Sequence, residues 1–356
     1  MEEIVAIILI ILIIFSVINV FYMNIYNKYG NIMYTFLIVL LALLAGLRYG
    51  TADYIGYINI FEWTPDLITT VSNNDYTYFF TMREEIGYLF LNSFVKVFTD
   101  EYIWFFFLVA SISMTMYYFS IRKYAIYPML SILLYFSMVY MVKDMAQIRQ
   151  GLAIAIFAYS LRYVIENNFW KFFLCTASAS LFHISIWPVL IIYPLRKIKI
   201  NYYGMAFIGI ICAFCFSIDI VDTILFRFFP DYDFMNRLLL YLNSEFLVDN
   251  NLNRFYKYVV LFYLLGMFNN ILRMKYKLYD LMMVIFGCGL IFMAAWHEYP
   301  FFGDRFASPL WISISFLLPV MIGISNNKWY KILAVLIIVI VAVNSFINNL
   351  GLINPT

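Results

Sequence analysis

The stretch IVAIILIILIIFSVINVFYM, residues 4–23, is an apolar run without a charged residue. An α-helix needs about 20 such residues to cross the hydrocarbon core of a bilayer. Two Glu precede the run, without a basic segment before it or a small-residue cleavage site after it, so we expect a retained span. Of all 356 residues, 65% are hydrophobic and 12% are charged, which excludes a soluble domain. The sequence predicts an all-α polytopic membrane protein.

Apolar runs predict about ten transmembrane helices. They lie near residues 4–23, 32–47, 102–121, 126–142, 150–165, 203–219, 256–272, 279–296, 306–324 and 329–349. The sequence contains no internal repeat, which disfavours an inverted-repeat transporter. It also contains no Pro/Gly/Ser-rich linker, so we expect a single integral membrane domain over residues 1–356.

The basic residues predict the topology, because short cytoplasmic loops are rich in Lys and Arg. A single crossing of segment 172–194 would put the basic cluster at 196–199 outside. A re-entrant pair of half-helices, broken near His183 and Pro188, instead leaves every short Lys-rich loop in the cytoplasm. This topology leaves both termini outside, together with two long loops. The loops cover about 48–101 and 220–255, and each is expected to hold a short helix, over 84–98 and 231–246.

The predicted outer face is rich in both carboxylates and arginines. Arg48, Arg149 and Arg305 each lie at the outer end of a predicted span. One such Arg could serve as an interface anchor or pair with an acid. The three arginines together favour phosphate binding. A planar guanidinium group can donate to two phosphate oxygens at once, whereas a Lys ammonium group cannot bind them in this paired geometry. These residues indicate a site for a lipid-linked phosphate or pyrophosphate.

Candidate bases and sugar-stacking residues lie close to these arginines in the sequence. In GLRYGTADYIGYINIFEW, residues 46–63, Asp53 could deprotonate a sugar hydroxyl, or it could pair with Arg48 or cap a helix. Glu85 competes for the role of base. His183, in SLFHISIW, is either a base or a structural hydrogen-bonding residue. Aromatic residues of this region could stack on sugar rings or belong to the interfacial aromatic belt.

The sequence predicts no metal and no cofactor. Cys212 and Cys215 form a C-x-x-C inside an apolar run without a second pair, which favours two small core residues. His297 and Glu298 do not belong to an H-E-x-x-H motif. No Gly-rich nucleotide loop is present, which favours a donor carried by lipid. The net charge of +2 does not suggest a nucleic-acid partner.

Four short motifs together resemble the EpsG-like branch of the Wzy-type bacterial polysaccharide polymerases. They are RYGTADYIGY, REEIGYLFLN, MAQIRQGLAIAIF and ASLFHIS, and they occur in the same order between residues 46 and 190. The residues carried over are, in motif order, Arg48 with Asp53, Glu85 with Tyr88, Arg149 with Gln150, and His183. Arg237 and Arg305 are added from charge placement alone.

The resemblance implies a glycosyltransferase with a GT-C-like arrangement at the outer face of the bacterial cytoplasmic membrane. The enzyme would transfer a growing glycan from undecaprenyl pyrophosphate to a hydroxyl of a lipid-linked repeat unit, for O-antigen, capsule or exopolysaccharide. The expected catalytic residues are Asp53, Glu85 and His183. The expected substrate-binding residues are Arg48, Tyr57, Tyr88, Arg149, Gln150, Arg237 and Arg305.

The expected partners are the undecaprenyl-pyrophosphate-linked oligosaccharide and the lipid bilayer, with a chain-length regulator and a flippase as further candidates. Three alternatives stay open at this point. A lipid-linked oligosaccharide flippase would also need outer arginines, and a glycan ligase would share the donor chemistry. An acyltransferase would need a His–acid pair facing the cytoplasm, and the predicted cytoplasmic loops contain no His.

Overall fold

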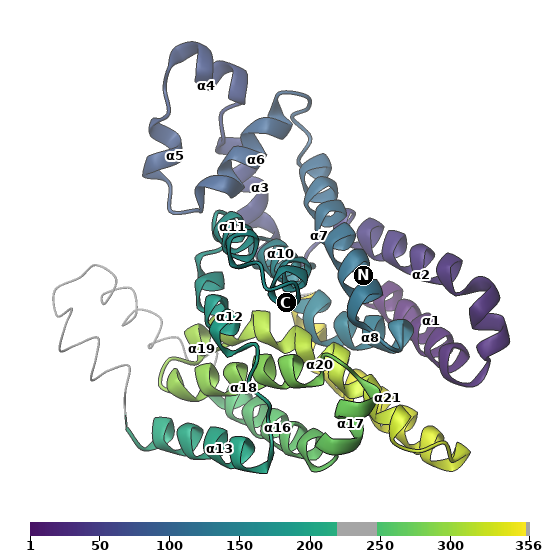
Figure 1. Cartoon of the computed structure of the whole chain (residues 1–356). Helices are drawn as coiled ribbons and strands as arrows, with labels where there is room; N and C mark the ends of the chain where they lie inside the picture. The colour runs from purple at the N-terminus through teal and green to yellow at the C-terminus, as the bar shows by residue number, and fades with distance from the viewer. Residues whose placement is uncertain (219–247, 354–356) are drawn as a thin grey trace. The chain divides into compact units, whose positions relative to one another are not determined.

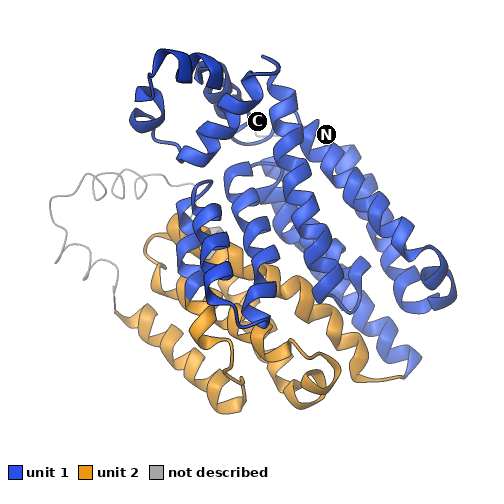
Figure 2. Cartoon of the chain, turned by 45° about the horizontal axis from the view of Figure 1, so that its top comes forward, with its two compact units in different colours: residues 1–190, 327–356 blue, residues 191–326 orange. Residues whose placement is uncertain are grey.

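The computed structural model describes residues 1–218 and 248–353, and this part of the chain is helical without a strand (Figure 1). The predicted all-α class is confirmed. The contacts divide the chain into two compact units, Met1–Leu190 with Asn327–Thr356 and Ile191–Asn326 (Figure 2). The predicted helix over 231–246 and the candidate residue Arg237 lie outside the described residues.

The first unit combines long apolar helices with short helices that follow α2. Helix α2 packs along α7, and α10 packs against both α7 and α11. The helices of this unit are α1 (Glu2–Phe21), α2 (Met23–Gly46), α3 (Tyr54–Trp63), α4 (Leu67–Asn73), α5 (Thr77–Thr81), α6 (Ile86–Lys96), α7 (Tyr102–Tyr124), α8 (Pro128–Tyr135), η1 (Phe136–Tyr140), α9 (Met141–Lys143), α10 (Ile148–Ile165), α11 (Phe169–Ser180), η2 (Ile184–Ile191), α21 (Lys328–Asn349) and η5 (Leu350–Leu352).

The second unit is organised around α18, which contacts α13, α16, α19 and α20. Since α18 is apolar on all sides, burial among neighbours is the expected outcome. The helices of this unit are α12 (Ile192–Leu195), α13 (Tyr202–Ser217), α16 (Val248–Met267), α17 (Asn269–Lys275), α18 (Tyr279–Ala295), α19 (Pro300–Ala307), η3 (Ser308–Trp311), α20 (Ile312–Leu317) and η4 (Leu318–Ile324).

Each of the ten predicted apolar runs contains helix, but not every helix is long enough to cross a bilayer. Six described helices meet the criteria of length and composition, and a bent pair brings the number to seven if it forms one span. The predicted runs at 126–142, 203–219 and 279–296 form shorter apolar helices. The predicted span at 256–272 is bent by 76° between Met267 and Asn269.

The region predicted to re-enter the membrane contains a helix break at the expected place. Helix α11 ends at Ser180, and the 3₁₀ helix η2 begins at Ile184. His183 lies in this break, and Pro188 lies inside η2. The side of the bilayer on which each end lies remains a prediction.

The predicted outer loop at 48–101 is largely helical, and α6 matches the helix expected over 84–98. The last turn of α6 is hydrogen-bonded to the end of α3 and the residue that follows it. Lys96 Nζ donates hydrogen bonds to the carbonyls of Glu62 and Thr64 at 2.9 and 2.7 Å. Ser93 Oγ donates to the carbonyl of Pro65 at 2.8 Å. These contacts give the segment between α2 and α7 a defined fold.

The connection between α9 and α10 is tight. The π-helix η1 precedes α9, and the amide of Met145 donates to the carbonyl of Tyr140 at 3.0 Å. A Cβ atom on Gly151 would lie only 2.7 Å from the carbonyl oxygen of Lys143, so this approach requires glycine. The turn places the charged pair Lys143 and Asp144 beside the first turn of α10.

Candidate functional site

The four motifs meet in the first unit, and a backbone contact joins two of them. The amides of Gly87 and Tyr88, at the start of α6, both donate to the carbonyl of Leu181, at 2.9 and 3.3 Å. A Cβ atom on Gly87 would lie 2.6 Å from Cβ of Leu181, so this docking also depends on glycine. The start of α6 therefore lies against the break that carries His183.

An ion pair links the second and third motifs. Arg149 Nη1, in the first turn of α10, donates to Glu85 Oε2 at 2.6 Å. The two side chains are 25% and 19% exposed. Glu85 Oε1 accepts a bond from the amide of Ile184 at 3.4 Å. Through its two carboxylate oxygens, Glu85 thus connects the start of α10 with the start of η2.

Two buried tyrosines connect Arg149 with Arg48. The guanidinium of Arg149 lies 5.6 Å from the ring centroid of Tyr88. The rings of Tyr88 and Tyr57 are 5.9 Å apart, and the guanidinium of Arg48 lies 5.9 Å from the ring of Tyr57. Negative ring faces stabilise nearby cations. Tyr57 and Tyr88 therefore fill the space between two guanidinium groups.

Arg48 is a buried cation without a carboxylate partner in the described part of the chain. Its side chain is 3% exposed, and its guanidinium lies 3.8 Å from the ring centroid of Phe106. Nη1 donates to the carbonyl of Ala45 at 3.2 Å, whereas Nε and Nη2 have no partner among the described residues. Burial lowers the pKa of Arg48 to about 10. The group stays charged at neutral pH and has two open donors.

Asp53 lies at the start of α3 with an exposed side chain and without an ion pair to Arg48. Its φ of 61° is in the left-handed region, which Asp tolerates better than most residues. The side chain does not cap α3, although the carbonyl of Asp53 accepts a bond from the amide of Tyr57 at 3.1 Å. The preceding amide, of Ala52, donates to the carbonyl of Leu352 at 2.8 Å.

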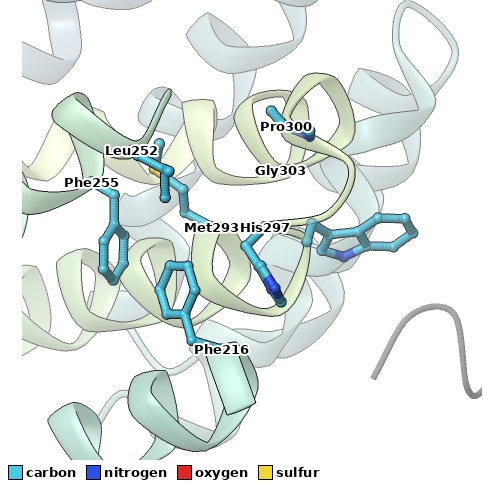
Figure 3. A pocket seen from close by; sticks show the side chains of 8 residues that line it. Phe216, Leu252, Phe255, Met293, His297, Pro300 and Gly303 are labelled. Atoms are coloured by element: carbon cyan, nitrogen blue, oxygen red, sulfur yellow. The ribbon is translucent and has the colours of Figure 1, made fainter. Parts of the chain in front are cut away.

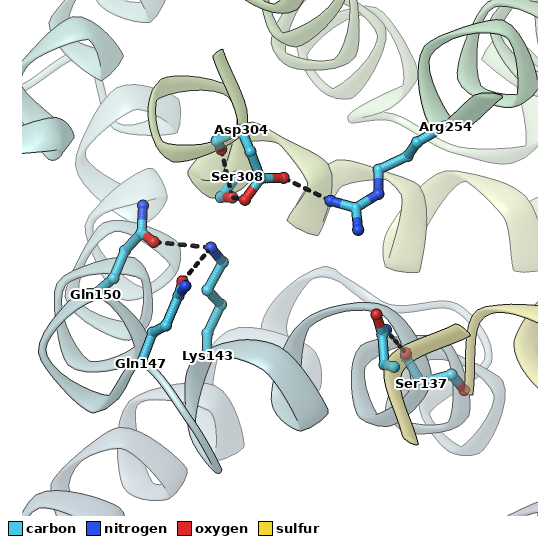
Figure 4. A network of polar contacts seen from close by, with 8 residues as sticks. Ser137, Lys143, Gln147, Gln150, Arg254, Asp304 and Ser308 are labelled. Carbon is cyan, nitrogen blue, oxygen red and sulfur yellow. Dashed lines mark hydrogen bonds and ion pairs between the residues drawn. The ribbon is translucent and has the colours of Figure 1, made fainter. Parts of the chain in front are cut away.

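A chain of polar side chains leads from Lys143 to His183. Lys143 Nζ donates to Oε1 of Gln147 and Oε1 of Gln150, at 2.7 and 2.8 Å (Figure 4). Nε2 of Gln150 donates to Oγ of Ser185 at 3.1 Å. Oγ of Ser185 lies 2.7 Å from Nδ1 of His183. Gln150 thus joins the third and fourth motifs.

The donors in this chain fix the tautomer of His183. A Lys ammonium only donates, so Gln150 must present its carbonyl oxygen to Lys143 and its amide group to Ser185. The backbone amide of Ser185 donates to Nδ1 of His183 at 3.3 Å, so Nδ1 is an acceptor. Neutral His183 therefore carries its proton on Nε2, where it is a donor.

Sequence reasoning missed two buried charged residues in this unit, Lys143 and Asp144, which are 3% and 4% exposed. Asp144 Oδ2 accepts a bond from the hydroxyl of Tyr135 at 2.7 Å. Burial raises the pKa of Asp144 to about 7, and the charge of Arg48 acts in the opposite direction. A Lys–Asp pair directly after the apolar run 126–142 was the available signal.

The second unit holds Arg305, the remaining described candidate. Its guanidinium lies 3.8 Å from the ring centroid of Phe301 on the same helix, α19. Elsewhere in this unit, Arg254 forms an ion pair with Asp304, with Nη1 2.6 Å from Oδ1 (Figure 4). Arg305 belongs to the second unit, and its role in substrate binding stays a prediction.

A small cavity of about 40 Å³ in the second unit has mostly apolar walls (Figure 3). His297 lines it, with its ring 4.8 Å from that of Phe216. Cys212 and Cys215 are buried and unpaired. Within residues 1–218 and 248–353, no three His, Cys, Asp or Glu residues group in a way that could hold a metal ion.

Comparison with known proteins gives one match. The model of the EpsG family matches residues 31–353, which is nearly the whole chain. No curated protein and no solved structure matches. The family match confirms the resemblance carried by the four motifs. The chain belongs to the EpsG family, whose members are Wzy-like polymerases.

Proposed function

We propose that this protein polymerises a polysaccharide at the outer face of the bacterial cytoplasmic membrane. It transfers a growing glycan from undecaprenyl pyrophosphate to a hydroxyl of a lipid-linked repeat unit. Membership of the EpsG family supports a polymerase role in the membrane. The observation that carries the finer proposal is the connected cluster from Arg48 through Tyr57, Tyr88 and Arg149 to Glu85.

The proposed reaction is a displacement at the anomeric carbon of the donor. The acceptor oxygen forms a bond to that carbon, while the bond from the carbon to the pyrophosphate oxygen breaks. The pyrophosphate leaves with the bonding electron pair, and the proton of the acceptor hydroxyl passes to a base. The reaction therefore needs a group that stabilises developing negative charge and a group that accepts a proton.

Arg48 and Arg149 are the proposed groups for the pyrophosphate. Arg48 has two open donors and no carboxylate partner among the described residues, so an anion would satisfy it. In a buried site its charge is screened less than in water. Arg149 is more exposed and already paired with Glu85, which suits a role at the entrance. Arg237 and Arg305 remain proposed contributors from charge placement.

The same contacts rank the three proposed bases. Both oxygens of Glu85 accept bonds, from Arg149 and from Ile184, which suits a residue that positions Arg149. Neutral His183 has its Nδ1 lone pair engaged by Ser185, so it is better suited to donate from Nε2. Asp53 is exposed and carries no such contact. We therefore favour Asp53 as the base.

The decisive experiment uses the full chain in proteoliposomes, supplied with its undecaprenyl-pyrophosphate-linked repeat unit. A polymerase produces a ladder of glycans that differ by whole repeats, with release of undecaprenyl pyrophosphate. A flippase would move the substrate across the bilayer without lengthening it. A ligase would transfer single units to a different acceptor. Either of these outcomes, without a ladder, would refute the proposal.

A further inference from the structure

The most exposed side chains of α6 and of the turn that follows it are all apolar. Ile86, Phe90, Phe94 and Phe98 are between 42% and 73% exposed. They recur every four residues, so they lie along one side of the helix. The other residues from 87 to 97 are buried or half-buried. We call these four residues the apolar stripe of α6.

The polar side chains of α6 lie on the other side. Tyr88, Asn92 and Ser93 are each at most 1% exposed. Asn92 Nδ2 donates to the carbonyl of Tyr88, and Ser93 Oγ donates to that of Pro65, both at 2.8 Å. Lys96, the one charged residue of α6, donates to two further carbonyls. A surface helix of a soluble protein has the reverse pattern, with polar residues outside. The arrangement therefore indicates an apolar environment beside the stripe.

The stripe is continuous with a helix that can cross a membrane. Phe98 lies four residues before α7, which has the length and composition of a span. Helix α6 packs against α7 (Figure 1). Ile103 and Trp104, in the first turn of α7, are also exposed. Trp is enriched where spans meet the membrane–water interface. The lipid around the start of α7 is therefore the apolar phase nearest to the stripe.

Another part of the same segment has the opposite character. Residues 72–77, SNNDYT, run from the end of α4 to the start of α5, and all six are exposed. Five of the six are polar or charged residues without an aromatic ring. Such a turn is typical of a surface in contact with water. The segment between α2 and α7 thus has one apolar surface and one polar surface.

We propose that α6 lies in the interface of the bilayer, with its apolar stripe in contact with lipid acyl chains. An interfacial amphipathic helix buries its apolar face about 5–10 Å into the boundary between head groups and acyl chains. The stripe carries no charge, so the contact does not depend on an anionic head group.

This position of α6 sets the depth of the candidate site. Tyr88 lies on the side of α6 away from the stripe, and Glu85, directly before the helix, holds Arg149. A helix with its side chains is about 10–12 Å across, so these groups lie about one helix diameter from the acyl chains. That is the level of the head groups, where the pyrophosphate of a lipid-linked substrate also lies. This consequence rests on the proposed function, whereas the lipid contact of the stripe does not.

The test attaches a nitroxide label to single cysteines in the full chain, reconstituted in phosphatidylcholine vesicles. The four native cysteines are first replaced by alanine, and thermal unfolding in detergent checks that each protein is folded. Phe90→Cys and Phe94→Cys place the label in the stripe. Ser72→Cys, in the exposed polar turn, is the matched control. Electron paramagnetic resonance then compares collisions with oxygen, which concentrates in acyl chains, and with a water-soluble nickel chelate.

We expect the labels at 90 and 94 to collide with oxygen and to be shielded from the nickel chelate, at a depth of about 5–10 Å. The label at 72 should show the opposite preference. Equal access of the nickel chelate to 72, 90 and 94 would place the stripe in water and overturn the inference. Shielding of 90 and 94 from both reagents would place protein against the stripe, and would overturn it as well.

The measurement needs no substrate, so it separates this inference from the proposed function. If the stripe labels lie in lipid and the wild-type protein makes no glycan ladder, the lipid contact stands and the proposed function fails. If a ladder forms while the stripe labels lie in water, the proposed function stands and this inference fails.

Discussion

Breaking the Arg149–Glu85 ion pair should lower the free energy of unfolding. The effects of substituting the two residues should also be non-additive, because each residue is the partner of the other. Loss of one partner from a fully buried pair costs about 3–5 kcal/mol, and loss from an exposed pair costs about 1 kcal/mol or less. With side chains 25% and 19% exposed, this pair lies nearer the buried limit. We expect Glu85→Gln and Arg149→Gln each to destabilise the protein by about 2–3 kcal/mol.

The double variant Glu85→Gln, Arg149→Gln should be less destabilised than the sum of the single variants, because it leaves no unpaired charge. The measurement is thermal unfolding in detergent, where about 2–3 kcal/mol corresponds to roughly 4–6 °C for a large chain. Glu84→Gln is the matched control, since Glu84 forms no ion pair among the described residues. Additivity of the two single effects within about 0.5 kcal/mol would refute the coupling inferred from the 2.6 Å contact.

The activity of the same variants separates a positioning role from a catalytic one. The reversed pair Glu85→Arg, Arg149→Glu should recover part of the stability. It should not recover polymer synthesis, because it removes the guanidinium from the start of α10. A reversed pair that is both stable and fully active would exclude Arg149 from pyrophosphate binding.

Four further changes test other parts of the site. Arg48→Lys should lower polymer yield by about 10²-fold with normal membrane insertion, since a Lys keeps the charge and loses the fork; a wild-type yield would contradict this. Asp53→Asn should lower the rate at saturating substrate by about 10²–10⁴-fold, and a rate within a few-fold of wild type would exclude it as the base. Gly151→Ala should destabilise by about 1–3 kcal/mol because its Cβ would lie 2.7 Å from a carbonyl oxygen, whereas Gly56→Ala, with open space, should not. A cysteine introduced within 196–199 should react with an impermeant maleimide only after cells are permeabilised, and labelling in intact cells would overturn the predicted topology.

Hydropathy was sufficient to predict the helical class, because the apolar character of a span is a local property of the sequence. It was insufficient for the bend between Met267 and Asn269, since the run 256–272 is apolar on average. Asn269 is buried, and the pair Asn269 and Asn270 near the end of that run is a local sign of an interruption. Helix α17, which follows the bend, packs against η4, and this contact joins segments that lie far apart in the sequence.

The candidate site was only partly predictable. The order of the four motifs indicated which residues belong together, and Glu85, Arg149, Gln150 and His183 are now linked by contacts. The sequence places Arg48 at the end of an apolar run, but it does not tell whether the side chain points to the membrane surface or inward. Burial against Phe106 follows from the packing of α2 on α7.

The backbone bond from Ala52 to Leu352 bears on the order in which the protein is made. The first unit needs α21 and η5, yet 136 residues of the second unit, Ile191–Asn326, are translated before them. The segment around Asp53 therefore leaves the ribosome long before Leu352, the acceptor of the Ala52 amide, has been synthesised. The early helices of the first unit are therefore made before α21 and η5, with which they pack. A chain truncated before Lys328 would lack the acceptor of the Ala52 amide. Proteases that degrade incompletely folded membrane proteins could therefore act on this chain throughout the synthesis of the second unit.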